Sequence, residues 1–141
     1  MKTKPLTFLL ALTLLFLFSG SVYGDDLKDA IDAADRGDFK TAYKLWLPLA
    51  EQGHAHAQFN LGNMYLNGVG VPQDYALAHM WWNICGSSGD EGCVKNRNLV
   101  ENDMSPQQIE KAQEMARNWK PGVKKKGIFE QLREVWNKVT K

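Results

Sequence analysis

Apolar side chains recur every three or four residues along much of the chain, which is the spacing of one face of an α-helix. Between residues 54 and 67, Ala57, Leu61 and Tyr65 follow one another at intervals of four, with Met64 beside them. Polar residues occupy the positions between them, so the pattern predicts an amphipathic helix over about 54–67.

This pattern then breaks and resumes within a few residues, as it does at the corner of a helical hairpin. Gly68 and Gly70 permit positive φ angles, Pro72 fixes the backbone after them, and Asp74 is suited to cap a second helix. Gly62 lies inside the first helix, where glycine costs about 1 kcal/mol relative to alanine. We therefore expect the second helix to return antiparallel and cross it closely, through Ala78, Trp81, Trp82 and Cys85.

The chain also repeats itself at an offset of 36 residues. The helices predicted to end at Gly53 and at Gly89 are two copies of one helix, and each glycine suits a left-handed C-terminal cap. The equivalent positions are Ala42 and Ala78, Trp46 and Trp82, Gly53 and Gly89, and Ala57 and Cys93.

Flanking this unit are two more divergent ones. Upstream, a single Gly37 replaces the two-glycine corner, and Pro48 is expected to kink the second helix because it lacks a backbone donor. Downstream, a first helix is predicted over 91–100, and residues 105–108 predict a capping box that starts a second helix. That helix carries an apolar stripe formed by Ile109, Ala112 and Ala116 and extends to Trp119.

The stretch 55–90 resembles one Sel-one-like repeat (SLR), a relative of the tetratricopeptide repeat. The resemblance implies an all-α fold, a short α-α superhelix (solenoid) of antiparallel helix hairpins, and a non-catalytic scaffold role. One position departs from the family pattern, because Cys85 and Gly86 replace a pair of alanines. The matching residues are Ala57, Leu61, Gly62, Tyr65, Gly68, Gly70, Val71, Asp74, Ala78, Trp81 and Gly89.

Three segments of different composition are predicted. Residues 1–24 have the basic, apolar and small-residue order of a secretory signal peptide, so we expect export to the periplasm or beyond, with cleavage after Gly24 or Ser21. Residues 25–120 form the repeat domain (25–53, 54–89 and 90–120) and carry nine Lys or Arg against 14 Asp or Glu, which gives no electrostatic basis for binding nucleic acid. Residues 121–141 are basic.

Cys85 and Cys93 are the two cysteines of the chain, and export would place them in an oxidising compartment. They fall in the last turn of one predicted helix and the first turn of the next, so a structural disulfide would join consecutive units. Their spacing also resembles that of a cysteine-rich secreted subgroup of the family. Free buried thiols are the alternative, and neither a C-x-x-C motif nor a redox role is indicated.

The remaining candidate chemistry favours structural interpretations. His54, His56 and His79 lack a further ligand at a metal-binding spacing, so we expect surface histidines, no metal and no cofactor. No nucleophile, phosphate loop or paired carboxylates predict catalysis. The tryptophans could stack on carbohydrate, but their repeat positions favour packing between helices: Trp46, Trp81, Trp82 and Trp119.

A groove lined by the first helix of each hairpin is the expected binding surface. Its candidate residues are polar and lie off the apolar stripe: Gln58, Asn60, Asn63 and Asn67. We predict an exported scaffold or adaptor that binds a protein or peptide partner there. The alternatives are β-lactam binding or slow hydrolysis, associated with the cysteine-rich subgroup, and an envelope structural role.

The C-terminal residues predict one more helix, which is strongly amphipathic. It either caps the last repeat or, because Lys124, Lys125 and Lys126 precede it, contacts a membrane surface or a partner through 124–140. Its apolar face is formed by Ile128, Phe129, Leu132, Val135, Trp136 and Val139.

Overall fold

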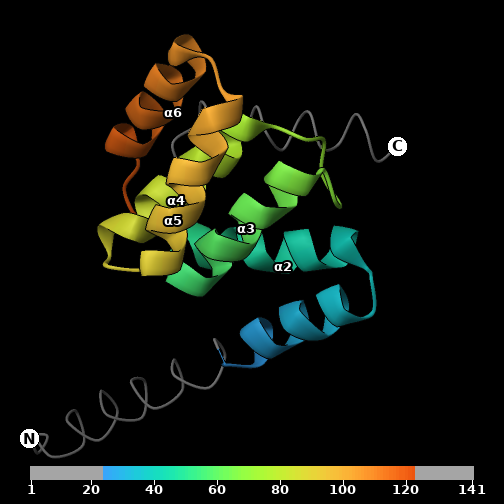
Figure 1. Cartoon of the computed structure of the whole chain (residues 1–141). Helices are drawn as coiled ribbons and strands as arrows, with labels where there is room; N and C mark the ends of the chain where they lie inside the picture. Colours follow the sequence, from blue (N-terminus) through green and yellow to red (C-terminus); the bar gives the residue numbers. More distant parts are fainter. Residues whose placement is uncertain (1–23, 123–141) are drawn as a thin grey trace, which may run out of the picture.

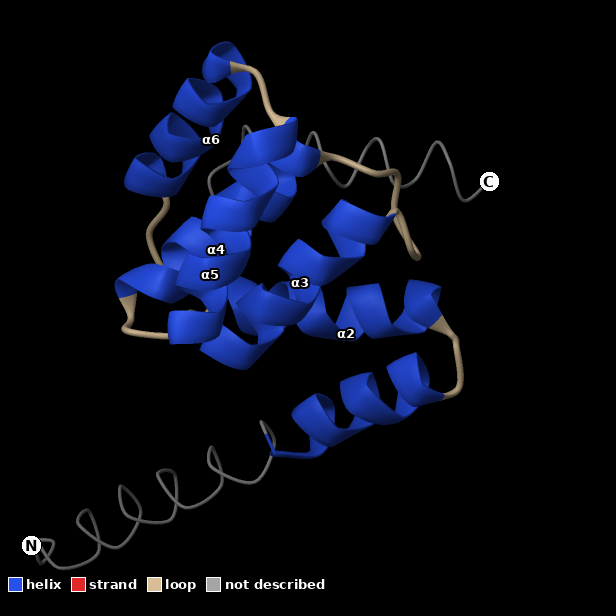
Figure 2. Cartoon of the chain, viewed as in Figure 1, coloured by secondary structure: helices blue, strands red, loops and turns tan. Residues whose placement is uncertain are grey.

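The computed structural model of the chain describes residues 24–122, and this part of the chain contains helices and loops but no strand (Figures 1 and 2). A first helix spans 24–35. It is followed by α2 (Phe39–Glu51), α3 (Ala55–Asn67), α4 (Tyr75–Ser87), α5 (Glu91–Val100), the 3₁₀ turn η1 (Glu101–Asp103) and α6 (Pro106–Asn118). The predicted all-α class is confirmed. The predicted signal peptide (1–24) and the predicted C-terminal amphipathic helix (121–141) lie outside the described residues, apart from residues 24, 121 and 122.

Short polar side chains start most of these helices. Asp38, Asp74 and Asp90 each accept a hydrogen bond from a backbone N–H in the first turn of α2, α4 and α5. At α6, the Ser105 side chain accepts from the Gln108 N–H while the Gln108 side chain accepts from the Ser105 N–H, which is the predicted capping box. Each such cap stabilises its helix by about 1 kcal/mol.

The corner between α3 and α4 has the predicted geometry. Gly68 caps α3 with a φ of 65°, and Gly70 has a φ of 72°. A Cβ at Gly70 would lie 2.6 Å from the Phe39 carbonyl oxygen, so this turn also packs against the start of α2. At Gly62 a Cβ would lie 2.6 Å from Cε2 of the Trp82 indole, which explains the glycine inside the helix. The close crossing of α3 and α4 at Gly62 is therefore confirmed.

Positions related by 36 residues hold equivalent places in the structure. Trp46 and Trp82 are 2% and 1% exposed, and Gly53 and Gly89 end their helices at φ angles of 99° and 93°. Ala42, Ala78, Ala57 and Cys93 are all fully buried. The same backbone path and the same core positions thus recur from one unit to the next. The prediction that Trp46, Trp81 and Trp82 pack between helices is confirmed.

The third unit differs from the two before it. Both α5 and α6 pack against α4, but they scarcely contact each other (Figure 1). After α6 the chain returns to the turn between α2 and α3, where the Gly122 N–H donates to the Glu51 carbonyl at 2.9 Å. Trp119 and Pro121 lie beside Gly53 at the same turn. One face of α5 is consequently left free of the rest of the described chain.

Candidate interaction surface

The predicted groove residues on α3 do not share one environment, and Gln58 is the exception. Its side chain is 1% exposed, and its Nε2 donates to the Ala50 carbonyl at 3.0 Å. The prediction that Gln58 lines an open groove is therefore wrong. The residue after Ala57 is turned by about 100° on the helix, and in this structure that direction faces the end of α2 rather than solvent.

Three asparagines on α3 remain accessible and are held by local hydrogen bonds. Asn60 donates from Nδ2 to the His56 carbonyl at 2.9 Å, and Asn67 donates to the Asn63 carbonyl at 2.8 Å. Asn63 reaches the next unit, because its Oδ1 lies 3.5 Å from Nδ2 of Asn96 on α5. These bonds use amide donors and leave the Oδ1 atoms of Asn60 and Asn67 as acceptors. The amide groups therefore form a polar strip from α3 to α5.

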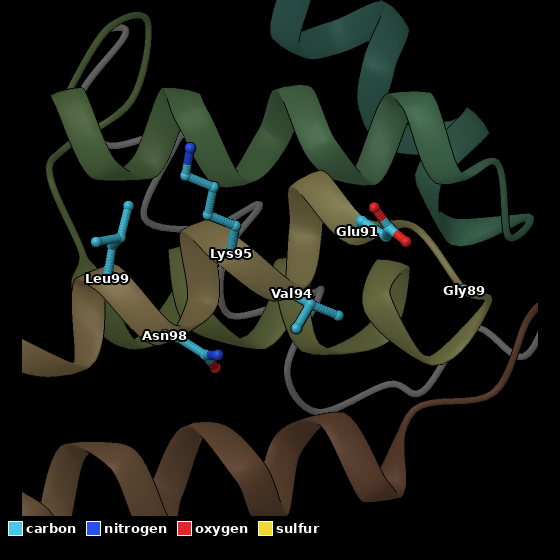
Figure 3. A pocket seen from close by; sticks show the side chains of 6 residues that line it. All are labelled: Gly89, Glu91, Val94, Lys95, Asn98 and Leu99. Carbon is cyan, nitrogen blue, oxygen red and sulfur yellow. The ribbon is translucent and has the colours of Figure 1, made fainter.

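A shallow pocket of about 470 Å³ lies on α5, the helix that also carries Asn96 (Figure 3). Lys95 extends from α5 toward α3, whereas Val94 and Asn98 lie on the opposite side of the helix (Figure 3). Leu99 is 55% exposed, an unusual value for a large apolar side chain in a described helix. The pocket is lined by Gly89, Glu91, Val94, Lys95, Asn98 and Leu99.

The sequence predicts a groove along the first helix of each hairpin, which includes α5, but the candidate residues it offered lie on α3 alone, so the residues of the α5 pocket were missed. A signal was present in the sequence: Leu99 falls outside the positions that face α4, where Cys93 and Val100 are buried. On a helix, residues 93 and 100 share a face and residue 99 lies about 100° away from the latter. Because single apolar side chains are common on protein surfaces, this signal places Leu99 outside the core but does not by itself predict a binding site.

Three successive links join α5 to α4. The Cys85–Cys93 disulfide connects the last turn of α4 to the first turn of α5, with Cα atoms 5.8 Å apart. Further along, Nη1 of Arg97 donates to Asn83 Oδ1 at 3.2 Å. At the far end, Nε2 of His79 lies 2.7 Å from the Glu101 carboxylate. The links keep α5 in place although α6 does not support it.

His79 departs from its predicted position. It is 0% exposed, whereas His54 and His56 are exposed as expected. The prediction that His79 lies at the surface is wrong, because its side chain belongs to the buried interface of α4 with the α5–η1 corner. Glu101 supplies a polar partner for Nε2, which offsets the cost of burying the imidazole.

Two successive helix pairs related by a constant step, with a free polar face, define a helical-repeat protein of the solenoid class. The Sel1 repeat model matches residues 31–54 and 55–90, so this part of the chain contains two Sel1 repeats. A search of curated proteins returned no match.

A solved structure supports the same fold: a protective antigen present in uropathogenic Escherichia coli strains, which displays an SLR fold. The two sequences are 25% identical, and the superposition has a TM-score of 0.54 over 72% of this chain. The matched region is 20% of the antigen chain, so the present protein corresponds to about a fifth of its length. The repeat fold itself indicates a scaffold for protein interactions.

Proposed function

We propose that this protein is an exported, non-catalytic adaptor that binds a protein or peptide segment along the surface formed by α3 and α5. Sel1 repeat proteins generally mediate protein–protein interactions, which supports the class of partner. The α3–α5 surface is defined here as Asn60, Asn63 and Asn67 together with Asn96 and the α5 pocket.

The single observation that carries this proposal is the fixed arrangement of amides between the two helices. Asn63 and Asn96 are paired across the units, and the neighbouring asparagines are held by their own backbone. Pre-ordered amides can pair with the N–H and C=O groups of an extended peptide without a further loss of side-chain entropy. Leu99 lies on the side of α5 that faces α3 (Figure 3) and provides an apolar contact, which a partner needs for affinity.

A crosslinking pull-down with variants of the full chain tests this surface. Asn67→Arg and Asn63→Arg each place a long charged side chain on the strip, and we expect both to lose the partner that the wild type recovers. Gln107→Arg is the matched control because it makes the same change of charge on an exposed position of α6. Recovery of the same partner at the same level by the α3 variants would refute the site, provided that circular dichroism shows folded protein.

Export is part of the proposal and rests on the sequence of residues 1–24 and on the cysteine pair. Among the described helices, none has the length and hydrophobicity that crossing a bilayer requires. Protein purified from its source is expected to begin after residue 24 or 21 by N-terminal sequencing. An intact residue 1 in a cytosolic fraction would contradict export.

Contact of residues 124–140 with a membrane surface is a separate proposal. It rests on the basic and amphipathic pattern of that segment alone. Deletion of 121–141 followed by cell fractionation tests it, since an envelope role predicts release of the shortened chain from membranes. An unchanged distribution leaves the adaptor proposal intact and refutes the membrane contact.

A further inference from the structure

The junction between α4 and α5 brings together two sulfurs and one carboxylate. Potential ligand atoms of Cys85, Asp90 and Cys93 all lie within 4.8 Å of one another. Both cysteines are fully buried, while Asp90 is exposed to solvent. Within the described part of the chain, this is the group of three metal-binding side chains that the fold places at such a distance.

We propose that the reduced form of this cluster binds a borderline or soft divalent cation, of the zinc and cadmium class, through two thiolates and the Asp90 carboxylate. Thiolates select such cations over magnesium and calcium, which prefer oxygen ligands alone. Three protein ligands leave one tetrahedral position for water. The cation takes the place of the disulfide as the link between α4 and α5.

Local geometry supports Asp90 as a ligand. One of its oxygens, Oδ1, accepts the Cys93 N–H at 2.9 Å, which fixes the carboxylate at the start of α5 beside the cysteine pair. Its other oxygen, Oδ2, has no hydrogen bond or ion pair to any described residue, and the residue is exposed to solvent. The carboxylate is therefore held in position with a coordinating atom available.

The charge of the site also fits its place in the fold. Two thiolates, one carboxylate and a divalent cation sum to a single negative charge at the N-terminus of α5. Helix N-termini stabilise negative charge, and they favour the thiolate form of cysteine. Gly86 and Gly89 lie between the ligands, and Gly89 has a φ of 93°, so the connection can adjust as the sulfurs separate around an ion.

Replacement of the disulfide by the metal ion requires a reductant. A phosphine reductant cleaves the sulfur–sulfur bond, takes the oxygen of one water to become a phosphine oxide, and leaves two thiols. Binding of the cation then releases the two thiol protons, as expected for thiolate ligands.

Cobalt(II) is a suitable probe because cobalt–thiolate sites absorb visibly. The full chain is reduced with a phosphine, transferred without oxygen into a reductant-free buffer and titrated with Co²⁺. We expect one ion per chain with thiolate-to-cobalt charge-transfer bands, displacement by Zn²⁺, and no bands from the oxidised protein. Absence of the bands from reduced, folded protein would overturn the proposal.

Asp90→Ser separates ligation from capping, because serine caps helices about as well as aspartate but brings no carboxylate. We expect it to weaken Co²⁺ binding by about tenfold or more. Asp74→Ser is the matched control, since Asp74 caps α4 in the same manner but lies away from the cysteines. Equal Co²⁺ affinity of the Asp90→Ser protein and the wild type would mean that the two thiols alone bind the ion and that Asp90 is not a ligand. That result would also overturn the proposal.

Discussion

The crossing of α3 and α4 at Gly62 allows a sharp test of how this repeat is packed. A Cβ at residue 62 would lie 2.6 Å from Cε2 and 2.7 Å from Cδ1 of Trp82. The indole has no free space into which to move, because Trp82 is 1% exposed, and its Nε1 donates to the Phe59 carbonyl at 3.2 Å. Gly62→Ala therefore forces either the helices apart or the indole away from its acceptor.

The change in the free energy of unfolding caused by Gly62→Ala is the sum of opposing contributions. Overpacking of a core costs about 1–3 kcal/mol, and an unpaired buried indole N–H adds about 1–3 kcal/mol. Replacing glycine by alanine inside a helix returns about 1 kcal/mol. We expect Gly62→Ala to lower the free energy of unfolding by about 3 kcal/mol. In a domain of this size that is a fall in Tm of roughly 10–20 °C.

A double-mutant cycle measured by urea unfolding checks the mechanism. Trp82→Ala removes all three indole atoms that the new methyl group would meet, so Gly62→Ala in that background should be neutral or stabilising by up to about 1 kcal/mol. The coupling between the two sites should then be about 3 kcal/mol. An equal loss from Gly62→Ala in both backgrounds, or a gain in the wild type, would refute the steric explanation.

Three further outcomes follow from local contacts. Reduction of the disulfide under metal-free conditions should lower the free energy of unfolding by about 2.5 kcal/mol, the loop-closure value for its separation of eight residues. An unchanged urea midpoint in protein whose free thiols are detected by mass spectrometry would disprove this loss of stability. His79→Ala should cost about 2–4 kcal/mol in a thermal melt, since it leaves a cavity and takes away the partner of Glu101. Hydrogen bonds donated by Thr41 hold the pKa of the Asp38 carboxyl below its ordinary value of 3.8. The ionised carboxylate therefore stabilises the folded protein above pH 3.8, and this contribution is lost as the pH falls through the lower pKa of the folded state. Asp38→Asn should remove this part of the pH dependence of the urea midpoint.

Elements governed by local sequence were predictable. The caps of α4 and α6, the Gly68 and Gly70 corner and the bounds of α5 depend on neighbouring residues, and all follow from the chain itself. The close crossing at Gly62 was also predictable, because a glycine in the middle of an amphipathic helix needs a steric reason. The 36-residue repeat extended these local rules to the core positions of the next unit.

Two side chains were misplaced because a helical wheel does not define where neighbouring helices end. Gln58 is polar and lies beside the apolar stripe, but the end of α2 covers it and accepts its hydrogen bond. His79 is likewise polar, and Glu101 follows it by 22 residues to provide a partner inside the interface. Such pairings depend on tertiary contacts that the composition of one helix does not contain.

The position of α5 connects the stability of the fold to the proposed binding surface. Because α6 packs on α4 and not on α5, the position of the pocket and of Asn96 depends on the packing of α5 against α4 and on the three links between these helices. Loss of the link at the N-terminal end of α5 frees the end that carries Gly89 and Glu91, both of which line the pocket. The pairing of Asn96 with Asn63 then has to be re-formed at an entropic cost before a partner can bind. The junction of Cys85 and Cys93 therefore does more than stabilise a short repeat domain. The disulfide, or an ion in its place, also holds the recognition residues of α5 in register with those of α3.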